Sequence, residues 1–429
     1  MNPLKRATFR LKCVVAMAAA GTSYGATTSS SAIIANSVLT TPGASAPKSL
    51  PDRPEDVYNL RNYCDDPCNT AAQQTAAFHR VEARINSGQG GTLYVPMGNW
   101  RFDAHVSGPI LFQRYGASIK GAGVGTTTVT VTEGAFVTWT IVPGFANGGH
   151  GSMSDIRLYG TDNPTSGAQV LLDRVNGFDL SNVWLGGGFV SLDLASATGV
   201  HGTNVTIEGD NRTPGSILMR VHRANEKAGH SSENDFVNIN LRGASGRTVT
   251  NSLVVNDSDG LWLNGGHIGF AVAEAFLLHP EYTSDAIDNI HSIGVDYDTA
   301  GYGVRFTPLA GWHGIAGNDY FLGGLAELMD NDGLRVDDSG VVGLVLDGFS
   351  TLRNGGYGIN IVAGQHVTIN GGDHAGNNQN NTGASHINIG GIAAFVSISS
   401  VSYRTWHTPT LNNLQISDTA DFVSVGPSD

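Results

Sequence analysis

The sequence has 429 residues, of which 57 are glycine and only 14% are charged, and its formal net charge is −13. A glycine share of about 13%, against a usual share of about 7%, favours many tight turns, while 40% hydrophobic residues and the lack of a Gly-X-Y period exclude disorder and collagen. The acidic balance excludes nucleic acid as a partner, because phosphate binding needs clustered lysine and arginine.

The first 25 residues predict a secretory signal peptide. Four basic residues precede an apolar run at 14–20, and small residues follow at 23–26. The apolar run is far shorter than the roughly 20 residues that span a membrane, so a membrane anchor is the weaker alternative. Cleavage after Gly25 would remove the four positive charges and leave a secreted chain, periplasmic or extracellular, with a net charge of −17 and no membrane contact.

Residues 26–55 are rich in Ser, Thr, Ala and Pro and predict a flexible leader. The mature part then keeps two cysteines, Cys64 and Cys68. An even count in an oxidising compartment predicts a disulfide between them. A metal site is the alternative, although no second Cys or His pair lies nearby at zinc-ligand spacing.

Residues 70–87 predict the one amphipathic helix of the chain. Thr70 and Gln73 match a capping box, and Phe78, Val81 and Ile85 recur at helical spacing. A strand-like stretch follows at 92–96. In a solenoid, such a helix would cover the apolar side chains that have no preceding coil.

After residue 92 the sequence consists of short apolar-polar-apolar stretches closed by Gly, Asn or Asp. Two series of triplets recur at steps of 23 to 29 residues: 334–336, 359–361 and 387–389, and beside them 344–346, 367–369 and 396–398. Two triplets per period predict a coil with several parallel strands per turn. A propeller or sandwich is the alternative, but its blades need about 40–50 residues each.

We therefore predict an all-β fold, a single-stranded right-handed parallel β-helix (solenoid) over residues 56–408 with a short N-terminal capping helix at 70–87. A C-terminal tail at 409–429 would follow it. The oligomeric state is not predicted.

The start of this region resembles the opening of the pectate-lyase superfamily. The resemblance rests on Asn-Leu-Arg-Asn-Tyr at 59–63, the Thr-headed helix, and Gly-Gly-Thr-Leu-Tyr-Val-Pro-Met-Gly-Asn-Trp-Arg-Phe at 90–102. More narrowly, it is similar to the rhamnogalacturonase/epimerase-like group, which includes phage tailspike depolymerases. It extends over about residues 56–405 and implies a right-handed β-helix that cleaves or binds acidic and neutral polysaccharides.

The chain also departs from this group. Residues 64–70 carry the two cysteines where the group commonly has a Gly-Asp-Gly loop. The Asn-Thr-Asp, Asp-Asp, Gly-His-Gly and Arg-Ile-Lys series of the polygalacturonase branch is missing, and only fragments stand at 265–267 and 313–314. The resemblance therefore implies the fold more strongly than the reaction.

The catalytic residues are expected in the middle of the solenoid. Asp296 and Asp298 would point outward from one strand, about 6–7 Å apart, and Arg305 should project to solvent nearby. Two carboxyl groups suit glycoside hydrolysis, whereas a base with a cation or a metal suits elimination from a uronate. The alternative is that these are solvated ladder residues and a surface ion pair.

Substrate contacts are expected from rings and histidines around this site: Trp262, His267, His291, Trp312 and His313. The alternative for each is a packing tryptophan or a structural histidine. Asp257 and Asp259 form a second carboxylate pair that a turn would also explain. The segment 225–234 would form the opposite wall of a groove.

The sequence therefore predicts a secreted enzyme that cleaves a polysaccharide, with a uronate-containing one favoured, by β-elimination or hydrolysis. The alternative is a non-catalytic, adhesin-like protein that binds such a polymer. No cofactor or metal site is predicted from the residues, although Ca²⁺ held by aspartate carboxylates would suit a lyase.

Overall fold

The computed structural model describes residues 56–88, 90–132, 134–140, 150–209, 211–244, 247–310, 312, 316–404 and 413–427. The predicted signal peptide and leader lie outside the described residues. Among the helices that are described, none combines the length and the apolarity needed to cross a membrane.

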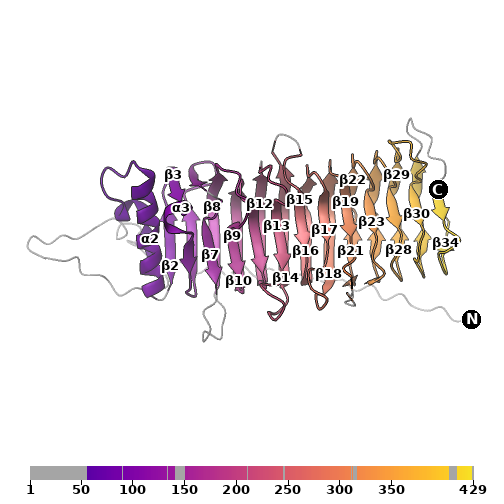
Figure 1. Ribbon diagram of the computed structural model, residues 1–429, viewed down its shortest axis with the longest axis horizontal. Coiled ribbons are helices and arrows are strands. Elements are labelled where there is room, and N and C mark those ends of the chain that lie inside the picture. Colours follow the sequence, from indigo (N-terminus) through magenta and orange to yellow (C-terminus); the bar gives the residue numbers. More distant parts are fainter. Residues whose placement is uncertain are drawn as a thin grey trace, which may run out of the picture. The chain divides into compact units, whose positions relative to one another are not determined.

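Parallel strands dominate the described part of the chain. Each turn of the coil adds strands to a 22-stranded sheet, sheet A, and one strand to a 12-stranded sheet, sheet B. Figure 1 shows these strands stacked one behind another along a single axis, from α2 at one end to β34 at the other. The predicted all-β parallel β-helix is confirmed.

The helical segments are η1 (Leu60–Tyr63), α2 (Ala71–Ser87) and α3 (Ala104–Ser107). The strands of sheet A are β1 (Val57–Asn59), β2 (Gly91–Val95), β3 (Gly98–Asp103), β5 (Ala117–Gly121), β6 (Thr127–Thr132), β8 (Gly151–Gly160), β10 (Asn176–Leu185), β12 (Thr198–Gly209), β14 (Ser232–Gly243), β16 (Ser258–Gly269), β18 (Ile287–Asp298), β20 (Ala316–Gly317), β21 (Tyr320–Leu322), β22 (Leu325–Glu327), β24 (Val341–Val342), β25 (Val345–Asp347), β26 (Ser350–Leu352), β28 (Thr368–Asn370), β29 (Asp373–Ala375), β31 (Ser397–Ser399), β32 (Ser402–Arg404) and β34 (Ser424–Val425). The strands of sheet B are β4 (Ile110–Phe112), β7 (Val137–Thr140), β9 (Ala168–Asp173), β11 (Val190–Ala195), β13 (Ile217–His222), β15 (Asn251–Val255), β17 (Glu274–Leu278), β19 (Tyr302–Phe306), β23 (Leu334–Val336), β27 (Ile359–Ile361), β30 (Ile387–Ile389) and β33 (Leu414–Ile416).

The long strands of sheet A bend at a shared corner, where the residue has a positive φ. In β8, β10, β12 and β14 that residue is Asp155, Asn182, Asn204 or Asn238, each with φ between 51° and 56°. Their side chains form a ladder in which each amide donates to the preceding coil, at 3.2, 3.2 and 2.8 Å. Asn and Asp tolerate this left-handed conformation, so the ladder repeats one corner from coil to coil.

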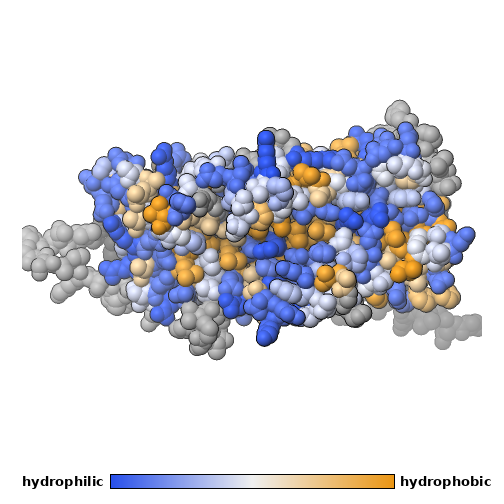
Figure 2. All heavy atoms as spheres, in the orientation of Figure 1, coloured by the Kyte–Doolittle hydropathy of each residue, from blue (hydrophilic) through white to orange (hydrophobic). Residues whose placement is uncertain are grey.

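The core is a column of like side chains stacked from one coil to the next. Leu334, Ile359 and Ile387 are register partners in sheet B, and all three are fully buried. The second predicted series is also in register, with Val345 beside Thr368 in sheet A. On the face drawn in Figure 2, hydrophilic residues run along both long edges and hydrophobic residues lie between them.

Helix α2 covers the first coils, as predicted. Thr70 and Gln73 form a complete capping box at its start. Phe78 of this helix is fully buried, with edge-to-face contacts to Phe102 at 5.5 Å and Phe136 at 5.6 Å between ring centroids. The helix therefore supplies the apolar surface that a preceding coil would otherwise provide.

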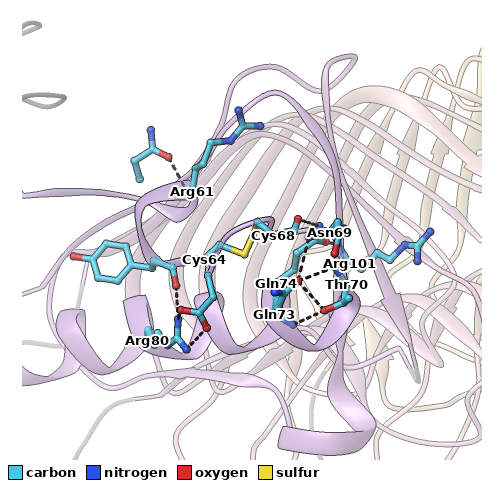
Figure 3. Close-up of a disulfide and its surroundings, with 12 residues drawn as sticks. Arg61, Cys64, Cys68, Asn69, Thr70, Gln73, Gln74, Arg80 and Arg101 are labelled. Atoms are coloured by element: carbon cyan, nitrogen blue, oxygen red, sulfur yellow. Dashed lines mark hydrogen bonds and ion pairs between the residues drawn. A yellow bond between two sulfur atoms is a disulfide. The ribbon is translucent and has the colours of Figure 1, made fainter.

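A disulfide closes a small loop in the segment before α2, and polar contacts hold this segment against the helix (Figure 3). Cys64 and Cys68 are bonded, which confirms the predicted bridge. Arg80 on α2 pairs with Asp65 at 2.7 Å, and Gln74 donates to the carbonyl of Cys68 at 3.1 Å. These contacts hold the chain against the capping helix.

The coil continues into the segment predicted as a tail. Strand β33 pairs with β30, and β34 pairs with β31, both in parallel. The solenoid therefore extends past residue 408, and the predicted boundary is too early. The repeat is hard to recognise there because the last strands are short and largely exposed.

Candidate active site

The predicted aspartate pair lies on sheet A. Asp296 and Asp298 both point outward from β18, on either side of the fully buried Tyr297. His267 on β16 is the register partner of Asp296, and its Nε2 lies 3.5 Å from Oδ2 of Asp298. The structure thus brings three of the predicted site residues together.

Asp298 is held in its ionised form. Burial acts to raise its pKa, but contacts with His267 and Thr299 outweigh it and leave the pKa below its usual value. An ionised carboxylate can orient the histidine or accept hydrogen bonds. It cannot act as a general acid.

Trp262 and His291 form a stack with Tyr320 on neighbouring strands of sheet A. The ring centroids are 5.5 Å apart between Trp262 and His291, and 5.0 Å apart between His291 and Tyr320. Burial lowers the pKa of His291. Because His291 has a ring against each face, it can offer a ligand only its edge.

Arg305 does not join the aspartate pair. It lies on β19 of sheet B, where its partners are Glu274 at 3.1 Å and Asp337 at 3.2 Å. The expectation that it lies near Asp296 is wrong, because the chain turns a corner at 299–301 and passes from one sheet to the other.

Trp312 is also placed differently from the prediction. Its side chain is buried in the core cluster, and its indole nitrogen donates to the carbonyl of Asp285 at 2.9 Å. Trp312 therefore supports the 279–286 loop and presents no open ring face. His313 lies outside the described residues.

A second set of polar residues, not predicted from the sequence, lies on sheet B and on the loop at 279–286. Asp193 on β11 accepts two hydrogen bonds from Arg220 on β13, from Nε at 3.0 Å and from Nη2 at 2.7 Å. Nε2 of His222, two residues along β13, lies 3.0 Å from Asp193 Oδ1, and its Nδ1 lies 4.0 Å from Oε2 of Glu281. We call these four residues the sheet B cluster.

Asp193 is ionised although it is buried. Burial acts to raise its pKa, but His222 and Arg220 outweigh this effect and lower the pKa below its usual value. A buried carboxylate that contacts an imidazole fixes the ring orientation and stabilises the protonated ring. The cluster thus has the parts of a general base: an imidazole, an orienting carboxylate and a neighbouring cation.

Two loops hold Glu281 in place. Oδ2 of Asp285 accepts hydrogen bonds from the backbone N–H groups of Glu281 and Tyr282, at 2.8 and 2.6 Å. Arg223, which is buried, lies between Asp285 and Asp257, with Nε at 3.4 and 3.2 Å from their oxygens. Arg223 therefore joins the 223–231 loop to the 279–286 loop.

The second predicted aspartate pair has structural roles. Asp257 is fully buried and binds His230 at 2.7 Å and the backbone N–H of Ala286 at 2.9 Å. Asp259 accepts from Asn289 at 3.1 Å. The two side chains therefore do not form a carboxylate pair.

The described residues contain no group of three or more His, Cys, Asp or Glu side chains arranged to hold a metal. A hollow of about 550 Å³ lies beside the disulfide, lined among others by Arg61, Asp66, Asn99 and Trp100. None of its lining residues is a histidine, so it offers no base of the kind found on sheet B.

No protein-family model matches the sequence, and no curated protein matches it. Solved structures that resemble the chain include the pre-mature bacteriophage phi29 gene product 12, with a TM-score of 0.56 and 14% identity over 86% of this chain and 52% of that one. An exopolygalacturonase from Thermotoga maritima has a TM-score of 0.52 and 10% identity over 88% of this chain and 93% of that one. These likenesses confirm the parallel β-helix fold that the resemblance implied.

Proposed function

We propose that the protein cleaves a uronate-containing polysaccharide by β-elimination at the sheet B cluster. The observation that carries this proposal is the ionised, buried Asp193, held between Arg220 and His222. A β-helix presents a long row of parallel strands, which suits a polymer. The exopolygalacturonase with this fold is named for action on a polyuronate, which supports the choice of ligand.

His222 would act as the base. Its buried Nε2 lies 3.0 Å from Oδ1 of Asp193, and Nδ1, on the side of Glu281, would take the C5 proton of a uronate residue. The C4–C5 double bond then forms, the C4–O bond to the next sugar breaks, and the departing oxygen takes a proton from solvent. Arg220 would bind the sugar carboxylate and stabilise the charge that develops on it.

Elimination fits the cluster better than hydrolysis does. Hydrolysis needs one protonated carboxyl group to donate to the leaving oxygen, and such a group has a raised pKa. Asp193 has a lowered pKa because of its partners. Glycoside hydrolysis between Asp193 and Glu281 is therefore the less favoured reaction.

Secretion remains a prediction of the sequence. It would place the protein where it meets extracellular polymers, as the proposal requires. Ca²⁺ bound together with the substrate carboxylate remains compatible with elimination.

The test is to incubate the mature protein with polygalacturonate, alginate and neutral glucans. The proposal expects ultraviolet absorbance from an unsaturated product with a polyuronate, and its loss in His222→Gln. New reducing ends without that absorbance would show hydrolysis instead. Binding with no new ends would show the adhesin-like alternative, and neither binding nor cleavage would refute a polysaccharide ligand.

A further inference from the structure

Two further arginines lie on the outer face of sheet B, away from the cluster. Arg305 Nη1 donates to Glu274 and its Nε to Asp337, at 3.1 and 3.2 Å. Arg335, the register partner of Arg305 on β23, donates from Nε to Asp337 at 2.7 Å and from Nη1 to Asp332 at 3.1 Å. Each guanidinium group is thus held in place by hydrogen bonds from two of its nitrogens, Nε and Nη1.

The carboxylates lie deeper than the arginines. The side chains of Arg305 and Arg335 are 27% and 28% exposed, against 10%, 15% and 5% for Glu274, Asp337 and Asp332. The charge that a ligand meets first is therefore positive. Arg220 at 29% above Asp193 at 6% repeats the same arrangement in the sheet B cluster.

Each arginine keeps one nitrogen for a ligand. Within the described part of the chain, Nη2 of Arg305 and of Arg335 makes no hydrogen bond or ion pair. The guanidinium carbons lie 4.4 and 6.0 Å from the ring centre of Tyr302, which supports them. A guanidinium group that is already held in place and has a free Nη2 is suited to bind a carboxylate, because its side chain loses little conformational entropy on binding.

The pair is aligned with Arg220. Register partners run from Arg220 through Val254 and Leu277 to Arg305. Three strand steps correspond to roughly 14 Å. Of the two intervening positions, Leu277 is partly exposed and Val254 is buried, and neither side chain adds a charge between Arg220 and Arg305.

We propose that Arg305 and Arg335 form a second carboxylate-binding subsite for the same acidic polysaccharide, about three strands from the reaction centre. This inference rests on the proposed function. The protein would then act on chains long enough to reach both places, and short oligosaccharides would be poor substrates.

The experiment compares oligogalacturonides and alginate oligosaccharides of increasing length as substrates of the intact mature protein. The inference expects kcat/KM to rise by about tenfold once the substrate spans both sites. Arg335→Gln should raise KM for long substrates by a similar factor, leaving kcat and the values for short substrates unchanged. Arg242→Gln is the matched control, since Arg242 pairs with Glu208 on sheet A.

The outcomes separate this inference from the proposed function. Cleavage that does not depend on length, with Arg335→Gln unchanged, would reject the subsite and leave the reaction centre standing. Equal losses on short and long substrates would assign Arg335 to the fold or the reaction centre, which also rejects the subsite. If Arg335→Gln does not fold, the length series of the wild-type protein decides alone. Failure of the wild-type protein to bind or cleave any polyuronate would reject both proposals.

Discussion

Asp193 and Arg220 are register partners on neighbouring strands and are joined by two parallel hydrogen bonds of 3.0 and 2.7 Å. This bidentate pair fixes the guanidinium plane and keeps the carboxylate ionised below the surface. It also sets the position of the carboxylate oxygen that His222 meets. The pair therefore determines the geometry of the proposed base.

Asp193→Asn should lower kcat by about 10²- to 10⁴-fold, the range expected when general base catalysis is lost. The amide keeps the shape of the side chain but cannot stabilise a protonated His222. Steady-state kinetics on a polyuronate would measure this, with circular dichroism as the check on folding. A variant with full activity would remove Asp193 from the mechanism.

Asp296→Asn should leave activity unchanged within about twofold, because a neutral surface change commonly costs little. Asp296 is exposed on sheet A, whereas the proposed base lies on sheet B. The same kinetic assay tests this, with Asp298→Asn beside it. Abolished turnover in either variant would move the active site to the aspartate pair on sheet A.

Two buried histidines should make the fold sensitive to acid. His374 is fully buried on β29 and its pKa is lowered to about 3 by burial, and the pKa of His386 is lowered to about 4. The unfolded values lie near 6.5. The contribution of the two neutral histidines to the free energy of unfolding is therefore fully present above about pH 6.5. It is lost as the pH falls toward their pKa values in the folded state, by a few kcal/mol near pH 4.

Urea unfolding between neutral pH and about pH 4 would measure this effect. The double variant His374→Gln, His386→Gln is the comparison, because the carboxylates titrate equally in both proteins. The difference in unfolding free energy between wild type and variant should shrink as pH falls. Parallel pH curves would show that these histidines do not control acid stability.

Phe78→Ala should destabilise the fold by about 3–5 kcal/mol, since it opens a cavity beneath the capping helix. Phe78 packs against Phe102 and Phe136 and is fully buried. Arg84→Ala, at an exposed position of the same helix, should stay within about 0.5 kcal/mol. Chemical unfolding compares the two variants, and equal stability would show that α2 does not cap the core.

The sequence was sufficient to predict the fold because the core repeats. The triplets at 334–336, 359–361 and 387–389 are register neighbours, and alternation placed their apolar residues inward. Alternation also placed Asp296 and Asp298 outward on one strand. These are local features, since each depends only on the pleat of one strand.

The site on sheet B could not be assembled in this way. Asp193, the Arg220 and His222 pair on β13, and Glu281 come from three different coils, and loops of unequal length hide their register. The prediction for Arg305 failed for the opposite reason. Arg305 is close to Asp298 in sequence, but the corner at 299–301 places it on the other sheet. One signal was present: Asp193 is the sole charged residue of the otherwise uncharged strand β11.

The most direct test of the central claim is a crystal structure of His222→Gln with a bound oligouronide. The account predicts the sugar on the outer face of sheet B, with one carboxylate at Arg220 and another at the Arg305–Arg335 pair. A sugar bound on sheet A beside Asp296 and Asp298 would contradict it.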